Sequence, residues 1–228
     1  AHPNLGVILL NGHGRDMNTR KIKIKQWFHK TVDNPGPVSA DDFNYFLVHN
    51  SGGILFISSA IYRTELAQEA LLAWPHSERN LAAQMFWVGY CAARAEFIIT
   101  SKLYTECAMG IGFTDKDPQW TFKMRYIDVP EVFNKLMRHG YDKKFCLFRI
   151  LQNIKNRHAT KIILGSFRRW PVFATKGTYR YGKIALKAML FYSFGKVNVK
   201  PQSASTEILV PVKSETVSLE FAKEGTRN

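Results

Sequence analysis

The chain has 228 residues, of which 46% are hydrophobic and 22% are charged, and this balance argues against a disordered or fibrous protein. Its formal net charge is +14, and nearly the whole excess lies in residues 141–200, where 14 Lys and Arg accompany one acidic residue, Asp142. A concentrated field of one sign repels itself, and a bound polyanion commonly offsets that repulsion.

The N-terminal two-thirds is predicted to be helix-rich, with a few strands. Apolar or period-two runs indicate strands, and good helix formers behind a capping residue or a proline indicate helices. In chain order we expect strands at residues 6–10 and 21–25, a helix at 39–49, a strand at 54–57, helices at 64–72 and 77–97, a strand at 119–127 and a helix at 130–138. The turn-prone residues 11–14 are expected to end the first strand, and Gly140 to end the last helix.

The C-terminal third is predicted to begin with one helix and then to become β-rich. Apolar residues recur at helical spacing over residues 143–156. Apolar runs separated by Gly, Pro, Asn and Ser then predict strands at residues 161–167, 172–176, 181–194, 207–212 and 216–221.

These patterns predict an α+β fold with a helix-rich N-terminal two-thirds and a β-rich, basic C-terminal third. No linker divides the chain, so a single domain over residues 1–228 is expected. It would combine a near-neutral α-rich part, 1–140, with a β-rich part, 141–228, that carries the basic segment 141–200.

Cysteine use favours a reducing compartment. Cys91, Cys107 and Cys146 are odd in number, widely spaced and set among apolar neighbours, which predicts buried, unpaired thiols. No secretory leader is recognised, and the apolar stretch 81–93 is shorter than the about 20 residues that cross a bilayer. We therefore expect an intracellular protein of the cytoplasm or nucleus with no membrane insertion, or a virion component if it packages a genome.

Aromatic residues interleave with the cations of the basic segment, as in proteins that bind single-stranded nucleic acid through phosphates and stacked bases. In the strand predicted at 181–194, Tyr181, Lys183 and Lys187 share one face. The structural alternative is that most of these rings belong to the core and that the lysines lie on a solvated sheet face.

A denser signal is the sequence Arg168-Arg169-Trp170-Pro171, which joins two guanidinium groups suited to phosphate with an indole ring suited to stacking. An edge-strand arginine pair that prevents sheet aggregation is the alternative. The predicted nucleic-acid-binding residues are Lys21, Lys23, Lys25, Lys155, Arg157, Lys161, Arg168, Arg169, Trp170, Arg180, Tyr181, Lys183 and Lys187.

One stretch suggests an enzyme instead. His13 follows the first predicted strand in a Gly-His-Gly sequence, and residues 53–60 form a second predicted strand some fifty residues later. This order resembles caspase-like cysteine proteases, in which the first strand ends in His-Gly and the second in Ala-Cys. Ile61 stands where the nucleophilic cysteine belongs, so the resemblance implies an inactive relative unless Ser58 or Ser59 serves instead.

A metal-dependent nuclease is a further alternative, because Asp41 and Asp42 could bind a divalent ion, although capping of the predicted helix also explains them. The seven histidines show no metal-ligand spacing with the cysteines, and no dinucleotide or phosphate-cradling loop is recognised.

The sequence therefore predicts a non-enzymatic nucleic-acid-binding protein without metal or cofactor. RNA is favoured over DNA because exposed rings are most useful on unpaired bases. A homo-oligomer and a role as a viral nucleocapsid or coat-type packaging protein are further expectations.

Overall fold

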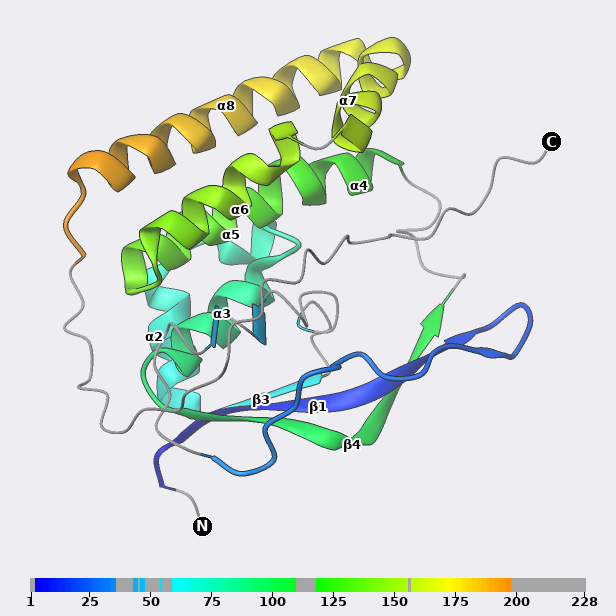
Figure 1. Ribbon diagram of the computed structural model, residues 1–228, viewed down its shortest axis with the longest axis vertical. Helices are drawn as coiled ribbons and strands as arrows, with labels where there is room; N and C mark the ends of the chain where they lie inside the picture. Colours follow the sequence, from blue (N-terminus) through cyan, green and yellow to red (C-terminus); the bar gives the residue numbers. More distant parts are fainter. Residues whose placement is uncertain are drawn as a thin grey trace.

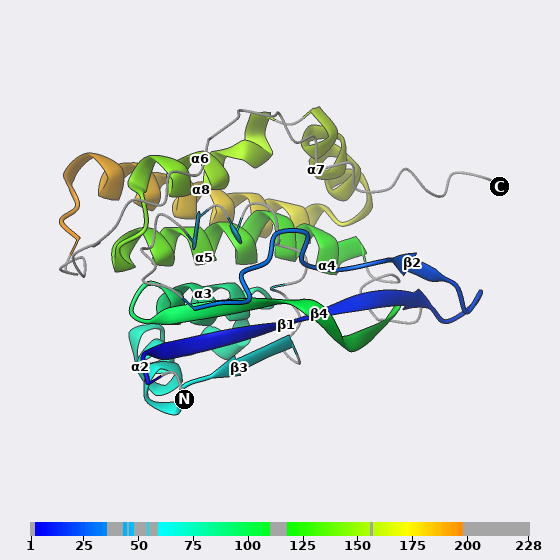
Figure 2. The same ribbon diagram turned by 60° about the horizontal axis from the view of Figure 1, so that its bottom comes forward.

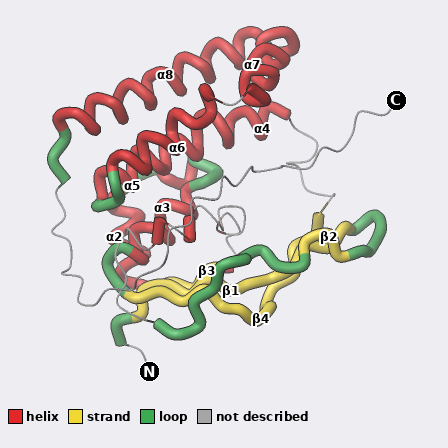
Figure 3. The backbone as a smooth tube through the Cα atoms, in the orientation of Figure 1, coloured by secondary structure: helices red, strands yellow, loops and turns green. Residues whose placement is uncertain are grey.

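The computed structural model describes residues 3–35, 43–44, 46–47, 54, 59–109, 118–155 and 157–197, without the side chains of residues 118 and 153–160. It has an α+β fold in which a small sheet lies at one side and the helices lie beyond it (Figure 1). Helices and strands form separate layers (Figure 3). In chain order the elements are β1 (Leu5–Asp16), β2 (Ile22–Ile24), β3 (Ala60–Tyr62), α2 (Thr64–Ala73), the short 3-10 helix η2 (Ser77–Arg79), α3 (Ala83–Ala92), β4 (Glu96–Met109), α4 (Pro118–Lys123), the π-helical turn η4 (Met124–Asp128), α5 (Val129–Leu136), the 3-10 helix η5 (Met137–His139), α6 (Lys143–Lys155), α7 (Arg157–Arg169) and α8 (Pro171–Phe194).

The sheet is built around β1 and is mixed. β4 runs parallel to β1 along its whole length, whereas β3 and β2 pair with it in antiparallel fashion near its two ends. β1 therefore continues through residues 11–14, where the sequence predicted a turn. The glycine at position 12 instead allows β1 and β4 to approach each other closely, because a Cβ there would collide with Thr105 of β4.

Asn11 ties this part of the sheet to the following loop. Its side chain is fully buried, and its Nδ2 donates to the carbonyl of Phe28 (3.0 Å) while its Oδ1 accepts from the Phe28 amide (3.0 Å). Its own amide donates to the Thr100 hydroxyl (2.8 Å), at a bulge of β4. The polar side chain thus satisfies buried backbone groups that the irregular sheet leaves unpaired.

Replacing Asn11 by alanine should lower the free energy of unfolding by about 1–3 kcal/mol, because the amide and carbonyl of Phe28 would remain buried without partners. Urea denaturation measures the change. Asn18→Ala, at an exposed turn residue, is the matched control and should stay within about 0.5 kcal/mol of the parent. Equal stability of the two variants would contradict this role of Asn11.

The helical layer is organised around α3, which contacts β1 on one side and α5 on the other. Nine of its ten residues are buried, among them Phe86 and Tyr90. α5 packs in turn against α6 and α8, and these two helices lie beyond α5 as seen from the sheet (Figure 1, Figure 2). The Tyr141 hydroxyl donates to the Gly89 carbonyl of α3 (2.7 Å) and links α6's start to this core.

Several predicted elements are confirmed. The helices expected at 64–72 and 143–156 are α2 and α6, the strand at 21–25 is β2, and the helix at 130–138 is α5 with η5. Gly140 has a φ of 102° and ends that helix as expected. Phe43, Asn44, Phe46 and Leu47 are helical, in agreement with the helix expected at 39–49, whose other residues lie outside the described part.

Other predicted elements of the N-terminal two-thirds are wrong. The helix expected at 77–97 is divided into η2 and α3, and its last residues begin β4. The strand expected at 119–127 is α4 and η4, where Phe122 and Tyr126, four residues apart, are both buried against Tyr181. Ile54 is helical, in contrast to the strand expected at 54–57, whose remaining residues are not described. Tertiary packing decides these segments because their local patterns fit either structure.

The strands predicted at 161–167, 172–176 and 181–194 are also wrong, because these residues belong to α7 and α8. α8 buries one face with residues that recur every three or four positions, Ala174, Gly177, Tyr181, Ile184, Ala185 and Ala188. The buried residues of this segment therefore recur with the period of a helix and not with the period of two that a strand would show. The strands expected at 207–212 and 216–221 lie outside the described residues.

All three cysteines are free, as predicted, and Cys91 and Cys146 are buried. Cys107, which was also expected to be buried, is partly exposed on β4. Among the described residues, none of the helices combines the length and the apolar character that crossing a membrane requires.

Candidate nucleic-acid interface

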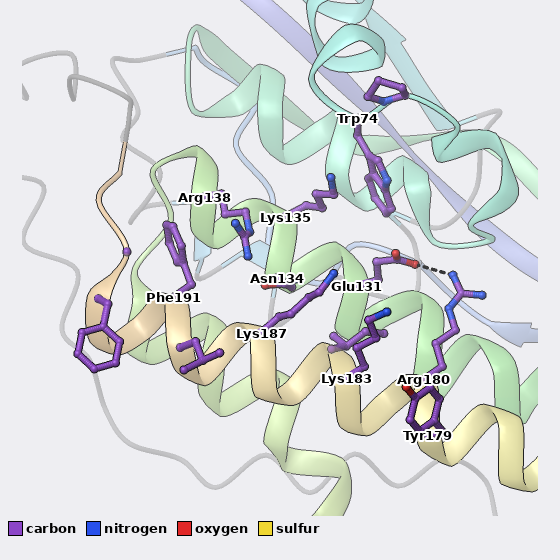
Figure 4. A pocket seen from close by; sticks show the side chains of 15 residues that line it. Trp74, Glu131, Asn134, Lys135, Arg138, Tyr179, Arg180, Lys183, Lys187 and Phe191 are labelled. Carbon is purple, nitrogen blue, oxygen red and sulfur yellow. Dashed lines mark hydrogen bonds and ion pairs between the residues drawn. The ribbon is translucent and has the colours of Figure 1, made fainter.

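A groove of about 1080 Å³ lies between α5 and α8, with Trp74 and Pro75 at the end of α2 forming part of its wall. Five cationic side chains and one carboxylate line it (Figure 4). The cations are Lys135, Arg138, Arg180, Lys183 and Lys187, and the carboxylate is Glu131. The groove is thus an electropositive hollow of a size that accommodates a ligand.

A stripe of cations on α8 borders the groove. Lys176, Arg180, Lys183 and Lys187 follow one another at spacings of four, three and four residues, which places them on the same face of the helix, and the last three line the groove itself. All four are exposed, and α8 packs on the core through another face. Lys183 and Lys187 extend toward α5 across the groove (Figure 4).

The other side contributes Lys135 of α5 and Arg138 of η5. The ammonium group of Lys135 lies 5.5 Å from the ring centroid of Trp74, and the guanidinium of Arg138 lies 4.7 Å from that of Phe191. Burial lowers the pKa of Lys135; Glu131 opposes this shift, and the positive charges of Arg138 and Lys187 add to it. These cations are therefore close enough to repel one another.

Glu131 is the carboxylate of the groove, and its charge is shared. Its Oε2 accepts from the guanidinium of Arg180 (3.2 Å) and from the side-chain amide of Asn80 (3.3 Å). Within the described part of the chain, Arg138, Lys183 and Lys187 form no salt bridge with a carboxylate. An anionic ligand would supply the missing negative charge.

Two exposed rings accompany the cations. Tyr179 is 74% exposed and Phe194 is 82% exposed, and both line the groove. Flat exposed rings of this kind can stack on unpaired bases.

Three of the residues predicted from sequence come together here, Arg180, Lys183 and Lys187. Tyr181 does not join them, and its assignment as a binding residue is wrong. It is only 6% exposed, its hydroxyl donates to the Ile150 carbonyl (2.7 Å), and its ring packs edge-on against Tyr126. In a helix, Tyr181 faces the core while Lys183 and Lys187 face outward, whereas a strand would have aligned the three.

The remaining predicted residues do not gather at the groove. Lys21, Lys23 and Lys25 lie on or beside β2, at the sheet side of the molecule and away from α8 (Figure 1). Lys23 is engaged there by a salt bridge to Asp16 (2.7 Å), which lowers the pKa of that carboxyl to about 2.

A second group lies near the other end of α8, at its junction with α7 (Figure 1). Lys161, Arg168 and Arg169 are exposed on α7, and the partly buried Trp170 precedes the first residue of α8. The backbones of Lys155 and Arg157 belong to α6 and α7, and their side chains are outside the described part. A role of this group in binding stays a prediction.

Sequence reasoning missed Lys135, Arg138, Asn134 and Trp74, because they lie in the near-neutral part of the chain. The signal that would have indicated two of them is the spacing of Lys135 and Arg138, three residues apart on a short amphipathic helix. Asn134 is 7% exposed, and its Oδ1 is buried without a hydrogen-bonding partner in the described structure.

The geometry around His13 does not favour the caspase-like alternative. His13 lies within β1, and its Nε2 pairs with Glu106 Oε2, which also accepts from Arg15. β3 runs antiparallel to β1, with Ile61 opposite Ile8, so His13 and Ile61 are about 16 Å apart along the sheet. A base must lie within hydrogen-bond reach of the group that it activates.

For the nuclease alternative, Asp41 and Asp42 lie outside the described residues. Among the residues that are described, no three His, Cys, Asp or Glu side chains lie close enough to hold a metal ion.

The pKa of His139, the residue after Arg138, is affected by the positive charge of this region. Its ring packs against Phe86 and Tyr90, with centroids 5.4 Å away in both cases. Burial, and then the positive charges of Arg94, Lys135 and Arg138, lower the pKa of His139 from 6.5 to about 4. The folded protein thus holds this imidazole neutral.

We expect the stabilising contribution of neutral His139 to be complete above pH 6.5 and to be lost as the pH falls from 6.5 toward 4, because the unfolded chain binds the proton more readily. Urea denaturation at several pH values measures this. His139→Phe, which keeps a ring but cannot titrate, should lose less stability over the same interval. Parallel pH profiles for the two proteins would contradict the buried, neutral state.

Comparisons with protein-family models, with curated proteins and with solved structures returned no match. The groove's residues are therefore the basis for a functional conclusion.

Proposed function

We propose that the protein binds single-stranded nucleic acid, with RNA favoured, in the groove between α5 and α8. The observation that carries this proposal is the convergence of five cations on one groove that contains a single, shared carboxylate. Two of these cations, Lys135 and Arg138, come from the near-neutral part of the sequence, so the fold adds to the charge concentration seen in residues 141–200.

The form of the groove suits one strand better than a duplex. The cations of α8 that line the groove form a line of about 10 Å from Arg180 to Lys187, which a single backbone can follow. Tyr179 and Phe194 offer faces on which unpaired bases stack, whereas paired bases are already stacked on their neighbours.

RNA is favoured over DNA because exposed rings are most useful on unpaired bases, which RNA presents in its single-stranded loops and ends.

Fluorescence anisotropy with a labelled single-stranded RNA tests the proposal across a range of salt concentrations. Five phosphate contacts predict that log Kobs falls with log[salt] at a slope of about −3.5. A single-stranded DNA of the same sequence should bind more weakly, and a blunt duplex more weakly still. Affinity that does not depend on salt, or a preference for the duplex, would contradict the proposal.

A packaging role and homo-oligomerisation remain proposals that extend this one. They require many copies of the groove to follow one strand. Sedimentation velocity of the protein with and without a long RNA tests them, and a complex of one copy per strand would argue against packaging.

A further inference from the structure

α8 has a second exposed face, on the side that points away from its buried residues. Val172, Tyr179, Leu186 and Leu190 follow one another at spacings of seven, seven and four residues, so they form one apolar stripe of about 27 Å along the helix, here called the outer stripe. All four are exposed, Val172 by 67% and Leu186 by 54%. Tyr179 and Leu190 also line the groove, whereas Val172 and Leu186 do not. The described part of the chain thus leaves this apolar face open.

The charge beside the outer stripe has one sign. The four cations of α8, from Lys176 to Lys187, run along one edge of the stripe. α6, α7 and α8 contain no Asp or Glu, since Asp142 is the one acidic residue of positions 141–200. An exposed apolar stripe that is bordered by cations and free of carboxylates is typical of helices that lie on anionic membrane surfaces.

A second copy of the chain fits the outer stripe less well than such a membrane. Two α8 helices packed through it would bring two sets of four cations to one interface, and α6–α8 offer no carboxylate to offset their repulsion. Anionic headgroups supply the opposite charge along the whole helix. Lysine and arginine stems lie along apolar surface while their charged ends stay in water, and the ring and hydroxyl of a tyrosine suit the same boundary.

We infer that α8 docks the protein on anionic membrane surfaces through the outer stripe, with the helix axis parallel to the surface. The apolar side chains of the stripe lie among the lipid headgroups, and the cations at its edge pair with the anionic groups of the lipids. The helix lies on the bilayer and does not span it. This inference goes beyond RNA binding and does not rest on it, because Val172 and Leu186 lie outside the groove.

Sedimentation of the full chain with extruded lipid vesicles tests the inference. Vesicles of phosphatidylcholine with about 30% phosphatidylserine should bind the protein about tenfold more tightly than vesicles of phosphatidylcholine alone, because cations near the surface gain from the negative potential of the anionic lipid. Binding to the anionic vesicles should weaken as the salt concentration rises, since salt screens this attraction.

The double replacement Val172→Gln with Leu186→Gln is the decisive variant, because it removes two apolar side chains of the outer stripe and leaves every cation in place. It should bind the anionic vesicles about tenfold more weakly than the parent, while its affinity for RNA stays within about twofold. Leu71→Gln with Leu72→Gln, at two exposed leucines of α2, is the matched control and should bind vesicles as the parent does. Thermal unfolding should show that both variants are folded, since all four positions are exposed.

Each outcome decides the inference. Equal binding of the parent to the two kinds of vesicle, or binding to neither, overturns it and leaves the proposed function intact. Undiminished vesicle binding by the stripe variant shows adsorption through charge alone and contradicts docking through the outer stripe. A parent dimer that becomes a monomer in the stripe variant, measured by sedimentation velocity, identifies a second copy as the occupant and also contradicts it. Vesicle binding that depends on the stripe supports the inference even if the parent binds no RNA.

Discussion

A double replacement of Lys183 and Lys187 by glutamate should reduce affinity for single-stranded RNA by more than about 100-fold. Each lysine is expected to contribute a charge-assisted contact of about 1.5–3 kcal/mol, and each glutamate adds repulsion. The salt slope should become shallower by about 1.4, because two phosphate contacts are lost. Stability should change little, since both side chains are exposed on α8 and form no salt bridge with a described carboxylate. Anisotropy titration of both proteins measures the difference.

The matched control replaces Lys21 and Lys25 by glutamate. This double replacement changes the net charge by the same amount at the other side of the molecule. Both lysines are exposed, so this variant should also fold normally. It should lose only the small affinity due to the altered total charge. Comparable losses in the two double variants would show that total charge, and not the α5–α8 groove, determines binding.

The second large effect concerns stability. Tyr181→Ala should lower the free energy of unfolding by about 3–5 kcal/mol, because it removes a buried ring that packs on Phe122 and Tyr126 and breaks the hydrogen bond to Ile150. Urea denaturation followed by circular dichroism measures this change.

Tyr179→Ala, two residues away, is the control and should change stability by no more than about 0.5 kcal/mol, because its side chain is 74% exposed. It should instead weaken RNA binding by about 1–3 kcal/mol, the value of one stacked base. If Tyr181→Ala were as stable as the parent, α8 would not be anchored as described. If Tyr179→Ala bound RNA as the parent does, its ring would not stack on a base.

Local patterns in the sequence predicted part of the fold. α2 and α6 are long enough, and their helix-forming residues continuous enough, for helical period to be recognised. Gly140 could be assigned because a left-handed residue at a helix end strongly favours glycine. β4, in contrast, depends on its parallel pairing with β1, about ninety residues earlier, and no local pattern contains that contact.

α8 shows why the candidate site was only partly predictable. Its small buried residues, such as Gly177 and Ala188, give a weak apolar signal, and its many aromatic and β-compatible residues favoured strands. Lys183 and Lys187 were nevertheless assigned to one face, because residues four apart share a face in a strand and nearly so in a helix. The spacing of Lys135 and Arg138 could place them on one face of a helix, but only the packing of α5 on α8 brings that face to the groove.

Ultraviolet cross-linking of a single-stranded RNA to the full chain, followed by mass-spectrometric mapping of the modified peptides, tests the central claim most directly. We predict cross-links to peptides of α8 that contain Tyr179 or Phe194, and to the peptide of α5 that contains Lys135. Cross-links confined to the β1–β2 region, or to the junction of α7 and α8, would contradict the assignment of the groove as the binding site.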